Sequence, residues 1–229
     1  KLTWMVVMLF FPVFGALFYW YTRRDVGHRL LKGIMAERQV QSRHQIDQDS
    51  SVMKALESRS PGAAGMARYV RRSGCFPVFA NTDVTYFPLG ETMFERMLTE
   101  LEQAEKFIFL EYFILDEGYM WDSILDILRR NAAAGVDVRV MYDGTCEFLL
   151  LPRDYPEKLK RLGITCKVFA PVTPFVSTHY NYRDHRKIAI IDGHTAFTGG
   201  INLADEYINE KSRFGHWKDT ALMLKGEAV

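Results

Sequence analysis

Cysteine is scarce in this chain of 229 residues, which contains only Cys75, Cys146 and Cys166. An odd number of thiols does not form a complete disulfide set, and their spacing matches no metal-ligand pattern. We therefore expect reduced and mostly packed cysteines, as in a domain that faces the cytosol. His179 and His194 also lack ligand spacing, so we assign no metal and no cofactor.

Net charge is equally small, because 29 Lys and Arg oppose 28 Asp and Glu. Without a broad basic field the chain is not expected to bind nucleic acid, although a local basic groove is not excluded. A hydrophobic content of 48% and a charged content of 25% argue against disorder and fit one globular domain with an attachment. The sequence contains no internal repeat and no low-complexity tract.

Charge is absent altogether between Leu2 and Tyr21, a run that is long enough to cross a bilayer as a helix. Its aromatic end is followed by Arg23 and Arg24, which predicts a cytoplasmic positive side. A signal peptide would carry its charges before the apolar run, and a buried core helix is the other alternative. We predict a transmembrane helix over residues 1–22, in a cell membrane, with the remaining chain in the cytoplasm. Because the chain begins with Lys1 and not Met, we also expect residues upstream.

Residues 23–80 are polar and basic, which predicts a juxtamembrane linker with short helical pieces. Its Arg and Lys side chains are suited to anionic headgroups, each contributing on the order of 1 kcal/mol near the surface. A linker that is merely solvated is the alternative.

Patterns typical of strands and helices alternate through residues 81–229, which we predict to be the catalytic domain. Strands are expected at 84–87, 107–115, 136–142 and 165–169, and helices at 91–105, 119–134 and 157–162. This alternation predicts an α/β sandwich with a mixed, largely parallel sheet flanked by helices.

The most informative segment runs from His185 through Lys187 to Asp192 and is followed by Gly199, Gly200 and Asn202. In an extended strand alternate side chains share a face, so the imidazole of His185 and the ammonium of Lys187 point the same way. A nucleophilic base and a cation can therefore contact the same substrate molecule. Phosphoryl transfer needs a nucleophile, a proton donor and positive charge on the phosphoryl oxygens, and this pair supplies two of the three.

The order HxKxxxxD, then six residues, then GGxN resembles the HKD motif of the phospholipase D superfamily, whose broader pattern has Ser at the position of Gly200. The segment is most similar to bacterial cardiolipin synthases. Further similarity to the same family lies at Asn181 to Asp184, Phe107 to Leu115, Gly135 to Asp143 and Trp217 to Thr220. The resemblance therefore covers the chain from about Tyr86 onward and implies a phospholipase D-like sandwich.

The resemblance implies a role for several residues. His185 is the expected nucleophile, which forms a phosphohistidine intermediate, and Lys187 is expected to bind phosphoryl oxygens. Asn202 would donate an amide hydrogen bond to the phosphate, while Gly199 and Gly200 let the backbone approach it or simply form a turn. Asp219, which we place in a strand beside Trp217, resembles the acidic partner of a catalytic imidazole; a surface salt bridge is the alternative.

Three further groups of acids are less specific. Asp192 belongs to the motif but is as well suited to holding the local loop through hydrogen bonds as to touching substrate. Glu111 interrupts an apolar strand, so it must be paired or face a polar cavity, where it would contact substrate. Asp143 and Glu206 are lesser candidates.

Only one HxK motif of this kind is present, whereas the resemblance implies that two face each other across a pseudo-twofold axis, one His attacking and the other protonating the leaving alcohol. The second half-site would come from a missing C-terminal half, which we favour, or from a homodimer. The expected activity is cardiolipin synthesis from two phosphatidylglycerol molecules with release of glycerol. Alternatives are a phospholipase D that uses water, a membrane-anchored homodimeric nuclease, and an inactive membrane module.

Overall fold

A computed structural model describes residues 2–23, 33, 37, 47–74, 76–171, 183–213 and 215–229, and the structural statements below concern these residues. They fall into two compact units. One unit includes helices α1 (Leu2–Phe10) and α2 (Pro12–Arg23) with residues 65–77. The other includes residues 48–64 and a seven-stranded sheet with its helices.

The apolar N-terminal run is divided into two helices, so the single continuous helix predicted over residues 1–22 is wrong. The break is at Phe11, directly before Pro12, whose ring suits the first position of a helix but not its interior. Trp4 of α1 contacts the rings of Phe18 and Tyr19 of α2, with centroids 5.6 and 5.5 Å apart. Within the part of the chain that the structure describes, no helix has both the length and the apolar character needed to cross a membrane.

Two helices lie within the predicted linker, in agreement with the short helical pieces expected there. Helix α4 (Ser50–Arg59) begins after Asp49, whose side chain caps it by accepting a hydrogen bond of 2.7 Å from the Ser51 amide. Helix α5 (Pro61–Gly74) begins with Pro at its first position.

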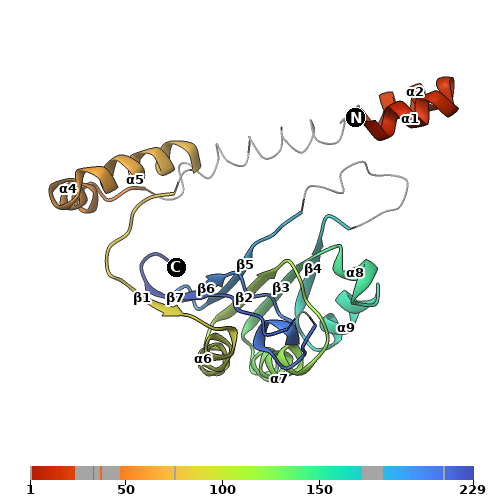
Figure 1. The fold of residues 1–229 in the computed structure, drawn as a ribbon. Helices are drawn as coiled ribbons and strands as arrows, with labels where there is room; N and C mark the ends of the chain where they lie inside the picture. Colours follow the sequence, from red (N-terminus) through yellow and green to blue (C-terminus); the bar gives the residue numbers. More distant parts are fainter. Residues whose placement is uncertain are drawn as a thin grey trace. The chain divides into compact units, whose positions relative to one another are not determined.

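The sheet has the strand order β1-β7-β6-β5-β2-β3-β4 (Figure 1). Its strands are β1 (Thr82–Phe87), β2 (Phe107–Tyr112), β3 (Asp137–Asp143), β4 (Thr165–Phe169), β5 (Lys187–Ile191), β6 (Thr195–Gly199) and β7 (Ala221–Gly226). The sheet is mixed as predicted, but it is not largely parallel. Among the strands that the structure describes, β2–β3 and β3–β4 are parallel pairs and the other four pairs are antiparallel; α7 connects β2 to β3, and α8 and α9 connect β3 to β4.

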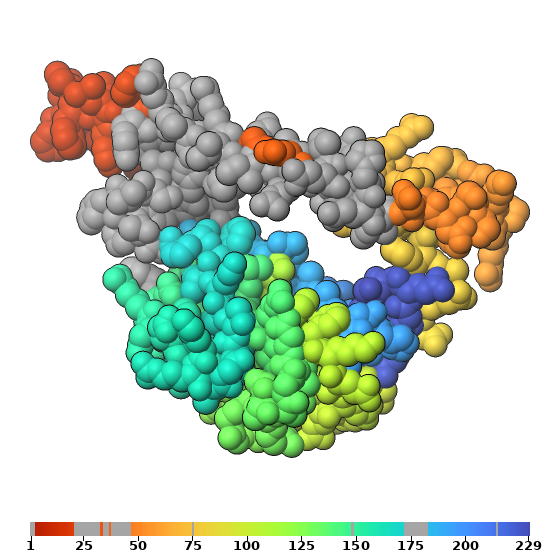
Figure 2. All heavy atoms as spheres, turned by 180° about the vertical axis from the view of Figure 1, so that it is seen from behind, coloured from red at the N-terminus to blue at the C-terminus, as the bar shows by residue number. Residues whose placement is uncertain are grey.

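Helices cover one face of this sheet. They are α6 (Gly90–Glu102), α7 (Tyr119–Ala133), α8 (Cys146–Leu149) and α9 (Tyr155–Arg161), and a short 3-10 helix, η1, spans Asp205–Ile208. Figure 1 shows α6 and α7 beneath the strands, and in Figure 2 the yellow-green and green segments that contain these two helices lie side by side. Alternate residues of β2 and β5 point toward them and are buried, among them Ile108, Leu110 and Ala189. Trp121 and Tyr155, both fully buried, join α7 to α9 through an indole–hydroxyl hydrogen bond of 2.5 Å.

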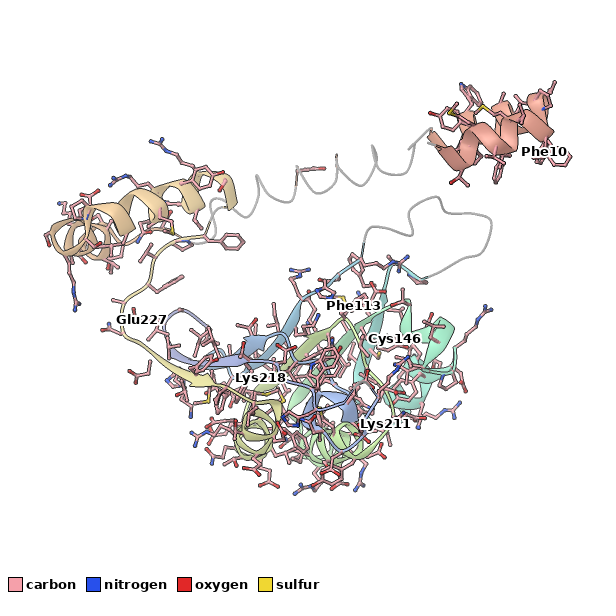
Figure 3. The ribbon with its side chains drawn as sticks, in the orientation of Figure 1. Phe10, Phe113, Cys146, Lys211, Lys218 and Glu227 are labelled. Carbon is pink, nitrogen blue, oxygen red and sulfur yellow. The ribbon has the colours of Figure 1, made fainter. Side chains whose placement is uncertain are left out.

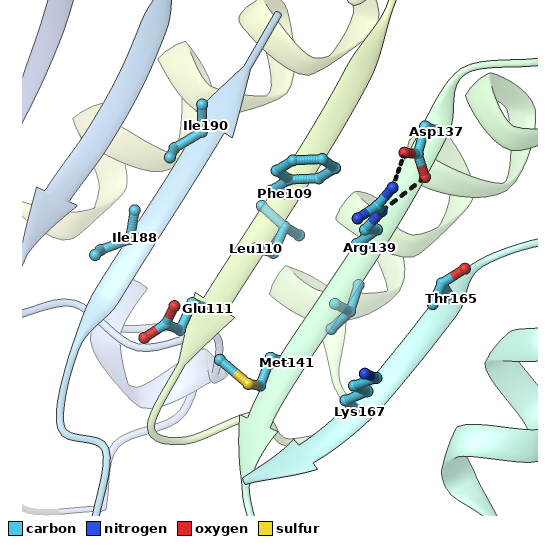
Figure 4. Close-up of a pocket in the computed structure, with 11 residues that line it drawn as sticks. Phe109, Leu110, Glu111, Asp137, Arg139, Met141, Thr165, Lys167, Ile188 and Ile190 are labelled. Carbon is cyan, nitrogen blue, oxygen red and sulfur yellow. Dashed lines mark hydrogen bonds and ion pairs between the residues drawn. The ribbon is translucent and has the colours of Figure 1, made fainter. Parts of the chain in front are cut away.

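The other alternating set of side chains lines a hollow of 530 Å³ on the opposite face (Figure 4). Its walls are apolar at Phe109, Ile188 and Ile190, and charged at Glu111, Lys167 and the ion pair between Arg139 and Asp137. Consecutive side chains of β5 therefore point to opposite faces of the sheet. The side chains around His185 are divided in the same way, with one set on each face.

The predicted helices and strands from residue 84 to 169 are confirmed, with boundaries that shift by up to three residues. Cys146 and Cys166 are free thiols, as expected, and burial raises the pKa of each, to about 11 and about 12. Cys75, His179, Asn181 and Tyr182 lie outside the described residues.

Candidate active site

The topology gathers the motif residues at one edge of the sheet. Strand β5 runs antiparallel to β2 and to β6, and β6 runs antiparallel to β7. The end of β2, the start of β5, the end of β6 and the start of β7 therefore meet. His185 and Lys187 enter this edge with β5, and Gly199, Gly200 and Asp219 arrive with β6 and β7.

His185 lies just before β5, not inside it as predicted, and its side chain is exposed. Its ring rests against Phe113, with centroids 4.7 Å apart. Phe113 follows β2, and Figure 3 shows it near Cys146, whose thiol donates to its carbonyl at 3.2 Å. The nucleophile candidate is thus supported on one side by an aromatic ring and accessible on another.

Lys187 points toward the same aromatic ring, as the alternation of side chains predicts. Its Nζ lies 5.3 Å from the centroid of Phe113 and donates a hydrogen bond of 2.8 Å to the carbonyl of His185. The residue is only 5% exposed, and this burial lowers the pKa of its ammonium, with a smaller opposing effect of the carboxylates of Asp219 and Asp184. A partly desolvated cation beside the imidazole is suited to stabilising phosphoryl oxygens.

Gly200 and Asp219 are packed against each other. A Cβ atom at Gly200 would collide with the Asp219 carboxylate, and one at Gly199 would collide with the carbonyl of Thr220. The Gly200 amide donates to that carbonyl at 3.0 Å, and Asp219 accepts a hydrogen bond of 2.8 Å from the Thr220 amide. This packing explains Gly200, since a Ser there would need Asp219 to move. Asp219 precedes β7 and is not in a strand, which corrects the prediction, and its negative charge acts on the Lys187 ammonium by opposing the decrease of its pKa.

Asn202 is brought near the same edge but is 2% exposed and engaged in the fold. Its Oδ1 accepts from the Ile114 amide at 2.9 Å, and its Nδ2 donates to the hydroxyl of Tyr207 at 2.8 Å. These bonds hold the segment after β6 to the segment after β2, where Leu115 and Leu203 form a bridge. A phosphate contact of Asn202 stays a prediction.

Asp192 lies at the far end of β5 from His185. At about 3.3 Å per residue, seven residues of extended chain span roughly 20 Å. Its carboxylate accepts hydrogen bonds from the amides of Glu105, Lys106 and Phe107 at 2.8, 2.7 and 2.8 Å, which lower its pKa against the opposing effect of burial. Asp192 and Gly193, both with left-handed backbone conformations, begin the three-residue turn between β5 and β6. The geometry thus supports the loop-holding alternative.

Glu111 belongs to a cluster on the opposite face of β5, which also contains Asp184 and Arg186. The Arg186 guanidinium contacts Glu111 Oε1 at 2.8 Å and both carboxylate oxygens of Asp184 at 2.8 and 3.0 Å. Burial, followed by the hydrogen bond and repulsion from Asp184, raises the pKa of Glu111 from 4.5 to about 7. Asp184 is held ionised by Arg186, which lowers its pKa to about 2 despite burial. Glu111 therefore faces the hollow behind the motif and not Lys187.

Asp143 and Glu206, the lesser candidates, have different surroundings. Asp143 is fully buried at the end of β3 and accepts from the Thr145 amide at 2.9 Å and from the Asp184 amide at 3.3 Å, so it anchors the approach to His185. Glu206 forms an ion pair of 3.7 Å with Arg213 in the η1 region.

Three residues around the motif were missed from the sequence: Phe113, Asp184 and Arg186. Phe113 looked like one more apolar residue of a strand predicted to reach 115, and only the end of β2 at Tyr112 turns it toward His185. Asp184 and Arg186 could have been found from the sequence. They alternate with His185 and Lys187, which places them together on the opposite side of an extended chain. Among the residues described here, no three His, Cys, Asp or Glu side chains are grouped as a metal site requires.

Replacing Glu111 by Gln is expected to change how stability depends on pH. Because the folded-state pKa is raised, ionisation of Glu111 destabilises the fold as the pH rises from about 4.5 through about 7. Glu111→Gln cannot ionise, so relative to wild type it should gain about 1 kcal/mol between pH 4.5 and pH 8, a value discounted for partial exposure and the Arg186 pair. Thermal unfolding in detergent at both pH values measures this gain.

The matched control is Glu95→Gln on the exposed side of α6, which should leave the pH dependence unchanged. Parallel stability curves for wild type and Glu111→Gln from pH 4.5 to pH 8 would contradict the assignment.

Comparison with known proteins shows the family of the chain. The family model described as cardiolipin synthase, PLD-like domain matches residues 97–213, which include the edge that carries His185, Lys187 and Asn202. The chain belongs to this family. A second model, phospholipase D-nuclease N-terminal, matches residues 1–24.

Relatives of this cardiolipin synthase-like chain extend over its whole length. An uncharacterized protein of Streptococcus mutans is 53% identical over 228 residues, covering 100% of this chain and 50% of the relative. A cardiolipin synthase of Geobacillus kaustophilus is 34% identical over 239 residues, covering 100% of this chain and 45% of that protein. The chain thus spans about half the length of the curated relatives that it matches.

A solved structure shares the fold of this family member. Phosphatidylserine synthase of Haemophilus influenzae superposes with a TM-score of 0.50 and 15% identity, over 62% of this chain and 33% of that chain. At this level of identity the similarity shows the fold alone.

Proposed function

We propose that this chain supplies one half of a phosphatidyltransferase site that makes cardiolipin from two molecules of phosphatidylglycerol. The observation that carries the proposal is the meeting of an exposed imidazole, His185, with a buried ammonium, Lys187, at one sheet edge of a cardiolipin synthase-like domain. Both groups lie against the ring of Phe113, at 4.7 Å between centroids for His185 and 5.3 Å from Nζ to the centroid for Lys187.

In the proposed first step a ring nitrogen of His185 attacks the phosphorus of phosphatidylglycerol. The bond from phosphorus to the glycerol oxygen breaks, and glycerol leaves with a proton from the second half-site. Lys187 stabilises the negative charge that spreads over the phosphoryl oxygens. The negative charge of the Asp219 carboxylate raises the pKa of Lys187 against the effect of burial and so favours the charged ammonium. The product of this step is a phosphatidyl-histidine.

In the second step a hydroxyl of another phosphatidylglycerol attacks the phosphorus and displaces His185. The proton of that hydroxyl passes to the group in the second half-site that protonated glycerol. Atoms balance over the cycle, because two phosphatidylglycerol molecules yield one cardiolipin and one glycerol. The second half-site is proposed to come from a second motif in a longer chain, as the length of the relatives favours, or from a second copy.

The membrane location is part of the same proposal. The match of residues 1–24 to a phospholipase D-nuclease N-terminal model and the exposed apolar side chains of α1 and α2, such as Leu9 at 79% and Phe10 at 72%, support an N-terminal membrane attachment. We place the sheet domain on the cytoplasmic side, where Arg23 and Arg24 follow the apolar run.

The test is conversion of phosphatidylglycerol by this chain extended with a C-terminal half like that of its relatives. We expect cardiolipin and glycerol in equal amounts, and activity that survives excess chelator, because His185 and Lys187 supply the nucleophile and the charge stabilisation. Lipid chromatography and a glycerol assay measure the two products.

Two results would count against the proposal. Phosphatidic acid without cardiolipin indicates a hydrolase that passes the phosphatidyl group to water. Activity that is lost with chelator and restored by a divalent ion indicates a metal-dependent mechanism.

A further inference from the structure

Helix α5 (Pro61–Gly74) is strongly amphipathic. At 3.6 residues per turn, Met66, Tyr69 and Val70 lie on one side, while Arg68, Arg71 and Arg72 lie on the other. The first group consists of large apolar or aromatic side chains and the second only of cations. The sequence of the helix contains no acidic residue.

The apolar side of α5 is open to solvent. Met66 is 69% exposed, Tyr69 is 72% exposed and Val70 is 40% exposed, whereas Ala64 is the one residue of the helix that is buried. Phe76, which follows the helix, is 66% exposed. A helix packed into a protein core would bury its large apolar residues, so this side of α5 is suited to an apolar medium other than the described core.

The basic side of α5 indicates which apolar medium the helix contacts. Three exposed arginines within five positions, with no carboxylate on the helix, complement a negatively charged surface. Guanidinium groups on long stems reach phosphate headgroups while the apolar side chains enter the acyl boundary beneath them. An apolar side and a purely cationic side on one short helix are together the pattern of a helix that lies in the interface of an anionic bilayer.

We propose that α5 binds the surface of anionic phospholipid bilayers, with Met66, Tyr69 and Val70 inserted and the three arginines against headgroup phosphates. Binding there is a second membrane contact, separate from the apolar N-terminal helices and from the chemistry of His185. In the sequence this contact lies close to the sheet domain, because only seven residues separate α5 from β1.

Hydrogen exchange of the full chain in nanodiscs tests this contact. Phosphatidylserine is the anionic lipid, since it is not the proposed substrate, and phosphatidylcholine is the neutral one. We expect the amides of residues 61–74 to exchange about tenfold or more slowly in phosphatidylserine than in phosphatidylcholine, because interfacial attraction lowers the population of unfolded helix.

Variants separate the two faces of the helix. The triple change Arg68→Gln, Arg71→Gln and Arg72→Gln should abolish the difference between the two lipids. The double change Met66→Ser and Val70→Ser should reduce protection in phosphatidylserine. Arg129→Gln with Arg130→Gln, which removes two exposed cations from α7, is the matched control and should change neither.

Equal exchange in the two lipids, or protection that does not depend on the three arginines, would overturn the proposal. Protection of residues 61–74 in detergent without any anionic lipid would also overturn it, since the helix would then be held by protein contacts. None of these outcomes depends on catalysis, so the His185→Asn protein should give the same exchange pattern as wild type.

Discussion

Replacing His185 by Asn is expected to reduce turnover of phosphatidylglycerol by on the order of 10⁴-fold or more, because the proposed mechanism depends on attack by a ring nitrogen of this residue. Asn keeps a polar side chain of similar reach but has no nucleophilic ring nitrogen. His185 is exposed and forms no part of the buried core, so folding and membrane attachment should persist. Initial rates of cardiolipin formation by the extended chain measure the loss.

His194→Asn is the matched control. His194 is also an exposed histidine, but it lies in the turn between β5 and β6, at the opposite end of β5. This variant should keep the wild-type rate within a few-fold. Comparable activity of the two variants would contradict the assignment of His185 as the nucleophile.

Replacing Asp192 by Ala is expected to destabilise the domain by about 2–4 kcal/mol, because three backbone amides lose their acceptor together. Those amides belong to the residues that lead into β2, so the change loosens the strand that carries Phe113 at its other end. Protein that stays folded should retain most of its activity, since Asp192 is remote from His185. Urea unfolding followed by circular dichroism gives the stability.

The control is Asp83→Ala, which removes an exposed carboxylate from the edge strand β1 and should cost little. The structural role of Asp192 is wrong if Asp192→Ala keeps the wild-type free energy of unfolding and loses its turnover number.

Periodicity in the sequence was enough to locate the central strands and helices. The apolar run at residues 107–110, the apolar alternation at residues 137–142 and the apolar stripe of α7 arise from burial, which a single sequence records directly. Strand direction is not recorded in this way. No strand was predicted at residues 195–199, and the antiparallel pairing of β5 with β2 joins segments about 80 residues apart and depends on tertiary contacts.

The candidate active site was likewise predictable only in part from the sequence. The resemblance to a known motif placed His185 and Lys187, and their shared contact with Phe113 is compatible with the roles proposed for them. The sequence could not show that the Asn202 amide forms hydrogen bonds with Ile114 and Tyr207. It also could not show that a side chain at position 200 would collide with the Asp219 carboxylate. Both facts depend on how separate strands meet. The prediction of a continuous N-terminal helix was wrong for a local reason, because Pro12 favours the start of a new helix.

A trapped covalent intermediate is the most direct test of the central claim, that His185 attacks phosphorus. The extended chain is mixed with phosphatidylglycerol labelled at phosphorus, quenched in alkali and digested, and the labelled peptide is identified. Phosphohistidine is expected to be stable to alkali and labile to acid, on the peptide that contains His185, and absent in His185→Asn. Label that persists in His185→Asn, together with cardiolipin formation, would contradict the claim and would assign the attack to the second half-site.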